Sequence, residues 1–275
     1  MNYPSSKPRL LGIAMVVGLS VAAVGVAWFF RPAPIETGAD LLSSQNGYGV
    51  HVESYGIFYM PDSPLGIGLI FYTEARVPPE AYEWLGAGLA AKGHPVYLVK
   101  SPLNFANFAP KMADAIRQAH PEIERWAVGG HGLGGQAAAL YAHGTKRPVA
   151  ALVLLAAVPP PFAGLATTNL QVLLVSASED GLLSDGKLRA AESVLPPTTR
   201  HVVIQGGNHA QFGEYGPAEG DGKAMIDGGR QRAMVLDSLA SFLDKVAAID
   251  RPAAAVQPNS GSGPTAPGSG TVSTP

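Results

Sequence analysis

The chain has no cysteine among its 275 residues. This absence excludes disulfides, thiolate metal sites and a cysteine nucleophile, and it suits a reducing or an oxidising compartment equally. An excess of positive charge is also missing, because the formal net charge is -2 at pH 7. Without a basic field that attracts a phosphate backbone, we expect no nucleic acid among the partners of this protein.

Signals for metals and nucleotides are lacking as well. No glycine-rich loop ends in Gly-Lys-Ser or Gly-Lys-Thr, as a phosphate-binding loop of the Walker type would. A polar stretch holds Asp221 and Asp227, but no second cluster of ligands accompanies it at a suitable spacing, and we interpret it as surface structure. The sequence therefore predicts no cofactor and no metal site.

One long uncharged run is present near the N-terminus. It begins at Leu10, ends at Phe30 and, at about 1.5 Å per residue, its roughly 21 residues extend about 31 Å, close to the hydrocarbon thickness of a bilayer. Lys7 and Arg9 precede the run, which by the positive-inside rule places the N-terminus in the cytoplasm. We expect a single-pass anchor in the cell membrane, with residues 1–33 forming the cytoplasmic N-terminus and the anchor and the main domain lying outside.

Two further interpretations of this run remain open. Small residues at Gly25 and Ala27 would suit a cleaved signal peptide, although the apolar run exceeds the usual signal core of about 7–15 residues. Ala14, Gly18 and Ala22 recur at every fourth position, a stripe through which two anchor helices could pack into a homodimer. Chance often produces such stripes in spans rich in glycine and alanine.

The opposite end of the chain has a different composition. Residues 251–275 consist mostly of proline, alanine, glycine, serine and threonine, with hardly any large apolar side chain. Such a segment cannot bury enough surface to offset its loss of conformational entropy on ordering. We expect a disordered tail there, which leaves residues 34–250 as one folded domain.

Between these ends, short apolar runs alternate with segments at helical spacing. Buried strands rich in Val, Leu and Ile are expected at residues 67–72, 96–100, 126–130, 149–156, 172–176 and 201–205. Helices are expected at residues 79–92, 108–120, 133–143, 186–194 and 230–246. This alternation predicts an α/β fold with a mostly parallel sheet between helices, while residues 49–60 suit one or two antiparallel edge strands. Ligands should bind at the carboxyl ends of the strands.

One predicted strand end matches a catalytic pattern with a single departure. Residues 127–135 read Ala-Val-Gly-Gly-His-Gly-Leu-Gly-Gly between an apolar strand and an alanine-rich helix, as in the nucleophile elbow G-x-S-x-G, but Gly132 stands where the serine would be. Gly130 and Gly134 remove side chains where strand and helix pack closely around the turn. We expect the neighbouring His131 to point away from the site and to serve in packing.

From about Gly47 to Val246 the chain resembles the α/β-hydrolase family, most of all its compact bacterial members whose elbow reads G-H-S-L-G-G. The resemblance is also carried by residues 68–72 (GLIFY), 93–106 (GHPVYLVKSPLNFA) and 206–213 (GGNHAQFG). It implies an α/β-hydrolase fold, a serine-hydrolase lineage acting on ester or acyl bonds, and a triad in the chain order nucleophile, acid, base.

Two of the three triad positions hold the residue that the resemblance implies. Asp180 follows a predicted strand where the family places its acid, and His209 follows the last strand where the family places its base. In the family's mechanism the histidine takes the proton of the nucleophile while the aspartate orients the imidazole. Gly132 has no hydroxyl, so no acyl-enzyme can form at this position.

The oxyanion-hole region departs from the family too. The amide after the nucleophile position belongs to Leu133, and the family's second donor comes from a Pro-Gly-Gly-like loop after an earlier strand. This chain instead reads Thr73-Glu74-Ala75-Arg76 at that loop. A carboxylate at Glu74 beside a developing oxyanion is unfavourable unless Arg76 neutralises it.

Three hypotheses about function follow. In the first, the chain is a pseudo-hydrolase that keeps Asp180 and His209 and binds a small acyl- or ester-like molecule or a protein. In the second, it is an atypical, weak hydrolase in which His209 and Asp180 activate water in the space left by Gly132. In the third, Gly132 replaces the serine in a variant of an active enzyme. The first hypothesis is favoured because it explains both departures, and the identity of the ligand stays undefined.

Overall fold

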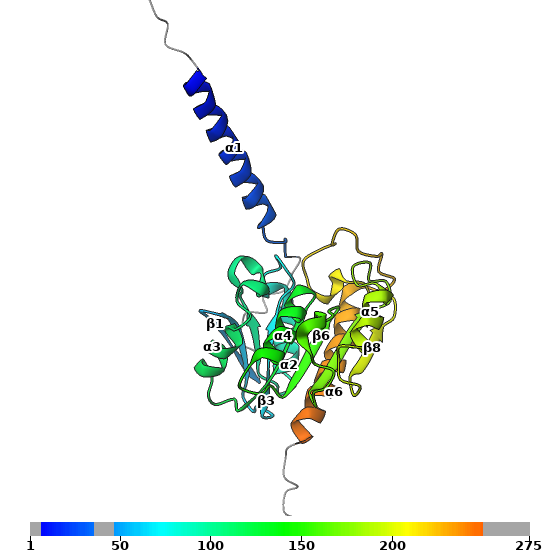
Figure 1. Cartoon of the computed structure of the whole chain (residues 1–275). Coiled ribbons are helices and arrows are strands. Elements are labelled where there is room, and N and C mark those ends of the chain that lie inside the picture. Colours follow the sequence, from blue (N-terminus) through cyan, green and yellow to red (C-terminus); the bar gives the residue numbers. More distant parts are fainter. Residues whose placement is uncertain (1–6, 36–46, 250–275) are drawn as a thin grey trace, which may run out of the picture.

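The computed structural model describes residues 7–35 and 47–249 (Figure 1). Its centre is an eight-stranded sheet in the order β1-β2-β4-β3-β5-β6-β7-β8. The strands are β1 (Tyr48–Glu53), β2 (Gly56–Pro61), β3 (Ile67–Tyr72), β4 (Val96–Val99), β5 (Arg125–His131), β6 (Ala151–Leu155), β7 (Gln171–Ala177) and β8 (Arg200–Ile204). The tail expected at residues 251–275 lies outside the described residues.

Pairing within the sheet confirms the predicted topology. Neighbouring strands from β4 through β3 to β8 run parallel, whereas β1 pairs with β2, and β2 with β4, in the antiparallel direction. All six expected strands are present, and the edge expected at residues 49–60 forms the antiparallel pair. The parallel strands β3 to β7 are buried on both faces, which accounts for their apolar sequences, whereas the edge strand β8 is largely exposed.

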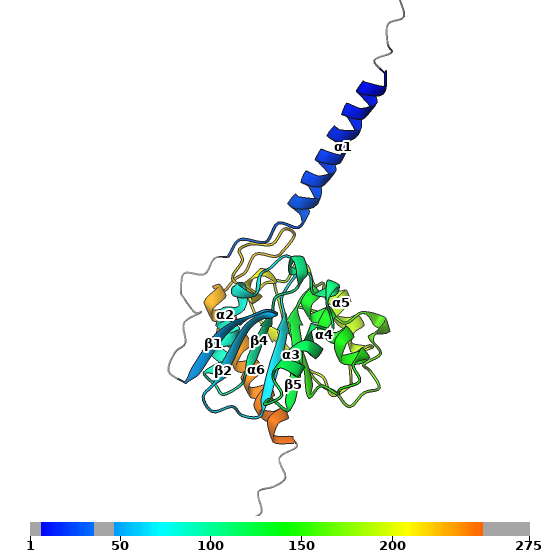
Figure 2. The same cartoon turned by 90° about the vertical axis from the view of Figure 1, so that its left-hand side faces the viewer.

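Helices cover both faces of the sheet. They are α2 (Glu83–Ala90), α3 (Met112–Ala119), α4 (Leu133–Gly144), α5 (Asp185–Glu192) and α6 (Gly228–Ile249). Because successive strand side chains point to opposite faces, Leu69 and Phe71 pack in the core under α2 and α6, while Ile70 and Tyr72 pack under α3, α4 and α5. Figure 2 shows α2 on one side of the sheet and α4 with α5 on the other.

Two helices begin later than the sequence predicts. Within residues 79–92 a 3-10 turn at Pro79–Tyr82 precedes α2, because Tyr82 has non-helical φ and ψ of -120° and 17°. Within residues 108–120, α3 begins only at Met112. Pro110 explains this delay, because proline disfavours helical geometry in the residue before it.

Helix α1 (Lys7–Phe29) projects from the domain, and its C-terminal end lies near the carboxyl edge of the sheet (Figure 1). From Met15 onward its apolar side chains are largely exposed, and Trp28 is 71% exposed. Among the residues that the structure describes, no helix is both long and apolar enough to cross a membrane.

The turn between β5 and α4 has the geometry of a nucleophile elbow. Gly132 has φ of 50° and ψ of -116°, a left-handed conformation that is strained for other residues. A Cβ at Gly130 would meet the backbone of Gly134, and a Cβ at Gly134 would meet the backbone oxygens of Tyr72 and Thr73. Glycine is therefore required on both sides of the turn, as the sequence predicts.

Candidate active site

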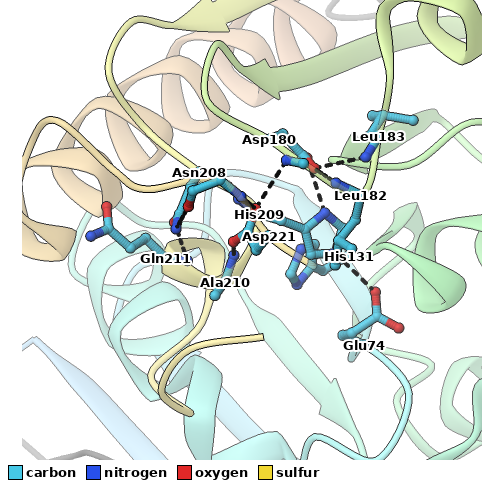
Figure 3. A network of polar contacts seen from close by, with 12 residues as sticks. Glu74, His131, Asp180, Leu182, Leu183, Asn208, His209, Ala210, Gln211 and Asp221 are labelled. Atoms are coloured by element: carbon cyan, nitrogen blue, oxygen red, sulfur yellow. Dashed lines mark hydrogen bonds and ion pairs between the residues drawn. The ribbon is translucent and has the colours of Figure 1, made fainter. Parts of the chain in front are cut away.

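The residues expected at the site converge at the carboxyl edge of the parallel strands, although they come from distant parts of the sequence (Figure 3). Glu74 follows β3, Gly132 joins β5 to α4, Asp180 follows β7 and His209 follows β8. Parallel strands bring their carboxyl ends to one edge of a sheet, which explains why four separate loops meet there. The structure thus assembles the predicted positions in one place.

Asp180 and His209, which were expected as acid and base, are in direct contact. Asp180 Oδ2 lies 2.9 Å from His209 Nδ1, and Asp180 Oδ1 accepts hydrogen bonds from the amides of Leu182 and Leu183 at 2.8 and 2.7 Å. The Asp180 side chain is 1% exposed and that of His209 is 7% exposed. The fixed carboxylate therefore holds the orientation of the imidazole, as in a catalytic triad.

A carboxylate fills the place where the nucleophile was expected. A Cβ built on Gly132 would collide with Glu74 Oε2, and this oxygen lies 3.3 Å from His209 Nε2. The Leu133 amide is 3.3 Å from both carboxylate oxygens, and the Ala75 amide donates to Oε1. Glu74 therefore occupies the space that a side chain at position 132 would take, and it also contacts the amide of Leu133.

The neighbours of Glu74 differ in part from the expected ones. In the sequence, Arg76 was considered as a residue that would have to neutralise Glu74, whereas the ionisable side chain that contacts the Glu74 carboxylate is His209. Thr73 is buried, and its hydroxyl donates to the carbonyl of Val77 at 2.7 Å. The Glu74 amide contacts the hydroxyl of Tyr82 at 3.3 Å instead of facing a substrate position. In this arrangement the Thr73 loop positions Glu74.

Two carboxylates control the protonation of His209. Burial alone lowers the pKa of His209, but hydrogen bonds and negative charge from Asp180 and Glu74 outweigh burial and raise that pKa to about 9. Burial raises the pKa of Asp180, yet the contact with His209 and the two amides bring it below its ordinary value. At neutral pH the site thus holds an imidazolium between two carboxylates.

His131 lies against the site and is fully buried, at 0% exposure. Its ring centroid is 4.5 Å from that of His209 and 5.4 Å from that of Phe212. The ring packs as expected, but the expectation that it points away from the site is wrong. Burial, followed by the charge of His209, lowers the pKa of His131 well below its ordinary value, so this ring is neutral.

Asp221 was expected to be surface structure, but it connects the acid loop to the base loop. Its carboxylate accepts hydrogen bonds from the amides of Gly181, His209, Ala210 and Gly222, at 2.8 to 3.2 Å. A sequence motif of Asp-Gly indicates only a turn. This supporting role depends on contacts such as that between Gly181 and Asp221, which lie 40 positions apart, so no local sequence pattern predicts it.

A cavity of about 1450 Å³ opens in front of these residues. Its walls include Glu74, Gly132, Leu133 and His209, and its lining reaches the C-terminal end of α1 at Trp28. Apolar side chains form much of the remaining wall, together with a few cations: Val77, Val158, Pro159, Pro160, Leu182, Leu183, Arg31, Arg76 and Lys187. This volume is larger than the roughly 300–1,000 Å³ of typical small-molecule pockets, so a small organic molecule would occupy only part of the cavity.

Comparisons with known proteins agree with this fold. A sequence model of the Alpha/beta hydrolase family matches residues 68–233. Among solved structures, a predicted CIB-like hydrolase from Thermoplasma acidophilum is 12% identical with a TM-score of 0.54, and the match covers 71% of this chain and 100% of that one. No curated protein sequence matches the chain.

Two structures named as esterases are similar to the chain in the same way. Carboxyl esterase 2 of the fungus Tuber melanosporum is 12% identical with a TM-score of 0.55, over 78% of this chain and 91% of that one. The esterase domain of a Rhodothermus marinus protein is 13% identical with a TM-score of 0.54, over 71% and 98%. At such low identity these similarities establish the fold alone.

The raised pKa of His209 predicts how stability depends on pH in metal-free protein. The folded-state pKa of about 9 exceeds the ordinary 6.5, so the stabilisation is complete below about pH 6.5 and is lost as the pH rises through about 9. The pKa difference corresponds to roughly 3 kcal/mol. In urea unfolding, the free energy of unfolding of the wild type should exceed that of His209→Gln by roughly 3 kcal/mol more at about pH 6 than at about pH 10.

His94→Gln is the matched control. Burial lowers the pKa of His94, which lies 3.1 Å from Asp244, so its contribution to stability changes only as the pH falls below about 6.5. The difference between the wild type and His94→Gln should stay constant above about pH 7. A constant difference for His209→Gln over the alkaline range would contradict the two-carboxylate arrangement.

Proposed function

Because the chain belongs to the alpha/beta hydrolase family, we propose that it is a pseudo-hydrolase that binds a small acyl- or ester-like molecule without forming an acyl-enzyme. The observation that carries this proposal is the position of the Glu74 carboxylate, which fills the place of the nucleophile at Gly132. Covalent acyl transfer needs a nucleophile at that place and a free amide at Leu133, and the site offers neither.

The presence of Glu74 in the site accounts for a glycine at position 132, and the glycine accounts for the position of the Glu74 carboxylate. A serine at position 132 would bring its Cβ into the Glu74 carboxylate, so the glycine makes room for the glutamate. Likewise, the glutamate gives His209 a partner at Nε2, where the family's histidine would otherwise contact the nucleophile. This fit favours Gly132 as the residue natural to the protein over the hypothesis of a serine enzyme carrying a substitution.

The water-activating alternative has less support. It requires free space beside Gly132, and the Glu74 carboxylate fills that space. It also requires an imidazole that accepts a proton at neutral pH, whereas His209 has a pKa of about 9 and is already protonated. In the metal-free chain, His209 therefore acts as a charged binding group.

The cavity and α1 complete the proposal. The apolar wall supplies contact for an acyl group, and Arg31, Arg76 and Lys187 supply positive charge for a carbonyl or carboxylate oxygen. The uncharged run from Leu10 to Phe30 supports a membrane anchor, with the domain held at the extracytoplasmic face. The lining at Trp28 would then bring the cavity close to the membrane surface.

A double substitution tests whether Gly132 marks the nucleophile position and whether Glu74 blocks it. In EDTA-treated full-length protein, we expect no turnover of p-nitrophenyl butyrate or p-nitrophenyl palmitate by the wild type, and little by Gly132→Ser, in which the serine collides with Glu74. Gly132→Ser combined with Glu74→Gly should exceed the single variant by at least about 100-fold, because it also frees the Leu133 amide for the oxyanion.

The triple variant that adds His209→Ala should lose this gained activity, because no base would remain to take the serine proton. Hydrolysis by the metal-free wild type that His209→Ala abolishes would contradict the pseudo-hydrolase proposal. An inactive double variant that is folded, as judged by circular dichroism, would contradict the assignment of Gly132 as the nucleophile position.

Binding is tested at the wall of the cavity. Ala190 lines the cavity on α5 and is exposed, so Ala190→Trp adds bulk to the cavity without disturbing the core. Saturation-transfer NMR with p-nitrophenyl butyrate as the probe should detect contact with the wild type and lose it in Ala190→Trp. Ala248→Trp, at an exposed position near the end of α6, should keep the signal. Equal signals from both variants would place binding elsewhere.

A further inference from the structure

His131 has one ring nitrogen that the packing of the domain does not use. Its Nε2 is buried and has no hydrogen-bond partner among the described residues. Burying a polar atom without a hydrogen-bond partner is unfavourable, so this nitrogen calls for an explanation. The ring lies 4.5 Å from that of His209, beside the site (Figure 3).

The Nδ1 atom of each histidine already contacts a polar side chain. His209 Nδ1 contacts Asp180 Oδ2 at 2.9 Å, and His131 Nδ1 contacts the Tyr82 hydroxyl at 2.8 Å. The Tyr82 oxygen can accept a hydrogen bond from Nδ1–H of His131, which leaves a lone pair on Nε2. Histidines that bind metals are commonly fixed in this way, with the second nitrogen donating to a carboxylate or another oxygen.

The spacing of the three side chains suits a single ion. One ligand atom each from Glu74, His131 and His209 lies within 4.8 Å of the other two, and Glu74 Oε2 is 3.3 Å from His209 Nε2. In a tetrahedral zinc site with bonds of about 2.0–2.1 Å, neighbouring ligand atoms are about 3.3 Å apart. One ligand pair already has this separation, and the other two pairs lie within 4.8 Å.

We propose that Glu74, His131 and His209 bind one divalent transition-metal ion of the Zn²⁺ type through the Glu74 carboxylate and the Nε2 atoms of the two histidines. Two imidazoles favour Zn²⁺, Co²⁺ or Ni²⁺ over Mg²⁺ and Ca²⁺, which prefer oxygen ligands. The metal replaces the proton on His209 Nε2, and that proton leaves to solvent. This exchange keeps two carboxylates, Asp180 and Glu74, close to positive charge.

Three protein ligands leave a fourth tetrahedral position. Glu74 and His209 both line the cavity, so the fourth position faces the cavity. An oxygen of water or of a bound carboxylate or carbonyl compound would complete the coordination. The sequence predicts no metal site because the three ligands are scattered over 136 positions, from residue 74 to residue 209, without a spacing motif.

Isothermal titration calorimetry with ZnCl₂ tests the proposal on the full chain, freed of any affinity tag, stripped with EDTA and kept in a non-ionic detergent. We expect one Zn²⁺ per chain. His131→Phe and Glu74→Gln should each weaken binding by at least about 100-fold, and Tyr82→Phe, which removes only a supporting hydroxyl, by about 10-fold. Co²⁺ should give the visible absorption of a tetrahedral site, lost in His131→Phe.

His120→Gln is the matched control, because His120 lies between two carboxylates outside this site, at 3.0 Å from Glu122 and 3.1 Å from Glu53. Its Zn²⁺ affinity should equal that of the wild type. If His131→Phe does not fold, Glu74→Gln supplies the same test, since Glu74 is partly exposed and glutamine keeps its shape. Equal Zn²⁺ affinity in the wild type and Glu74→Gln would overturn the proposal. That result would leave the pseudo-hydrolase proposal, tested without metal, intact.

Discussion

The contact between Glu74 and His209 determines what the rest of the site can do. His209 is nearly buried and stands between two carboxylates, one fixed by amides of the Asp180 loop and one on the loop after β3. Moving a charged imidazole out of water is costly, and here two opposite charges and two hydrogen bonds compensate that cost. The result is a histidine whose proton is held more firmly than in an ordinary triad.

The scaffold around this contact keeps the features of an acyl-transfer site. The elbow still takes a left-handed turn at Gly132, Gly130 and Gly134 still allow β3, β5 and α4 to approach, and Asp221 still joins the acid and base loops. What differs is the group at the centre. A carboxylate stands where the family's hydroxyl is expected, and we propose that the site therefore serves charge, coordination or non-covalent binding in place of covalent chemistry.

Local patterns in the sequence predicted much of the fold and part of the site. The buried strands and the elbow glycines each have a signal within a few residues, such as an apolar run or the G-x-S-x-G spacing, whereas Asp180 and His209 were placed by the resemblance to the α/β-hydrolase family. The late start of α3 also has a local cause in Pro110, which the spacing of apolar residues alone did not reveal.

Other parts of the site depend on contacts between distant segments. Glu74 was recognised as a departure from the family, but its position over Gly132 follows from how the loop after β3 packs on the hydroxyl of Tyr82. His131 was expected to turn away, yet its ring packs between His209, Phe212 and Tyr82. Such contacts join residues up to 135 positions apart, beyond the reach of a local motif.

The most direct measurement is an NMR titration of the His209 ring in protein labelled with ¹⁵N-histidine and stripped of metal, with its signals assigned by their loss in His209→Gln. If Glu74 occupies the nucleophile's place, both ring nitrogens stay protonated until the pH approaches about 9, and Glu74→Gln moves the pKa of His209 down towards its ordinary value. A wild-type pKa at or below about 6.5, or one that Glu74→Gln leaves unchanged, would contradict the account.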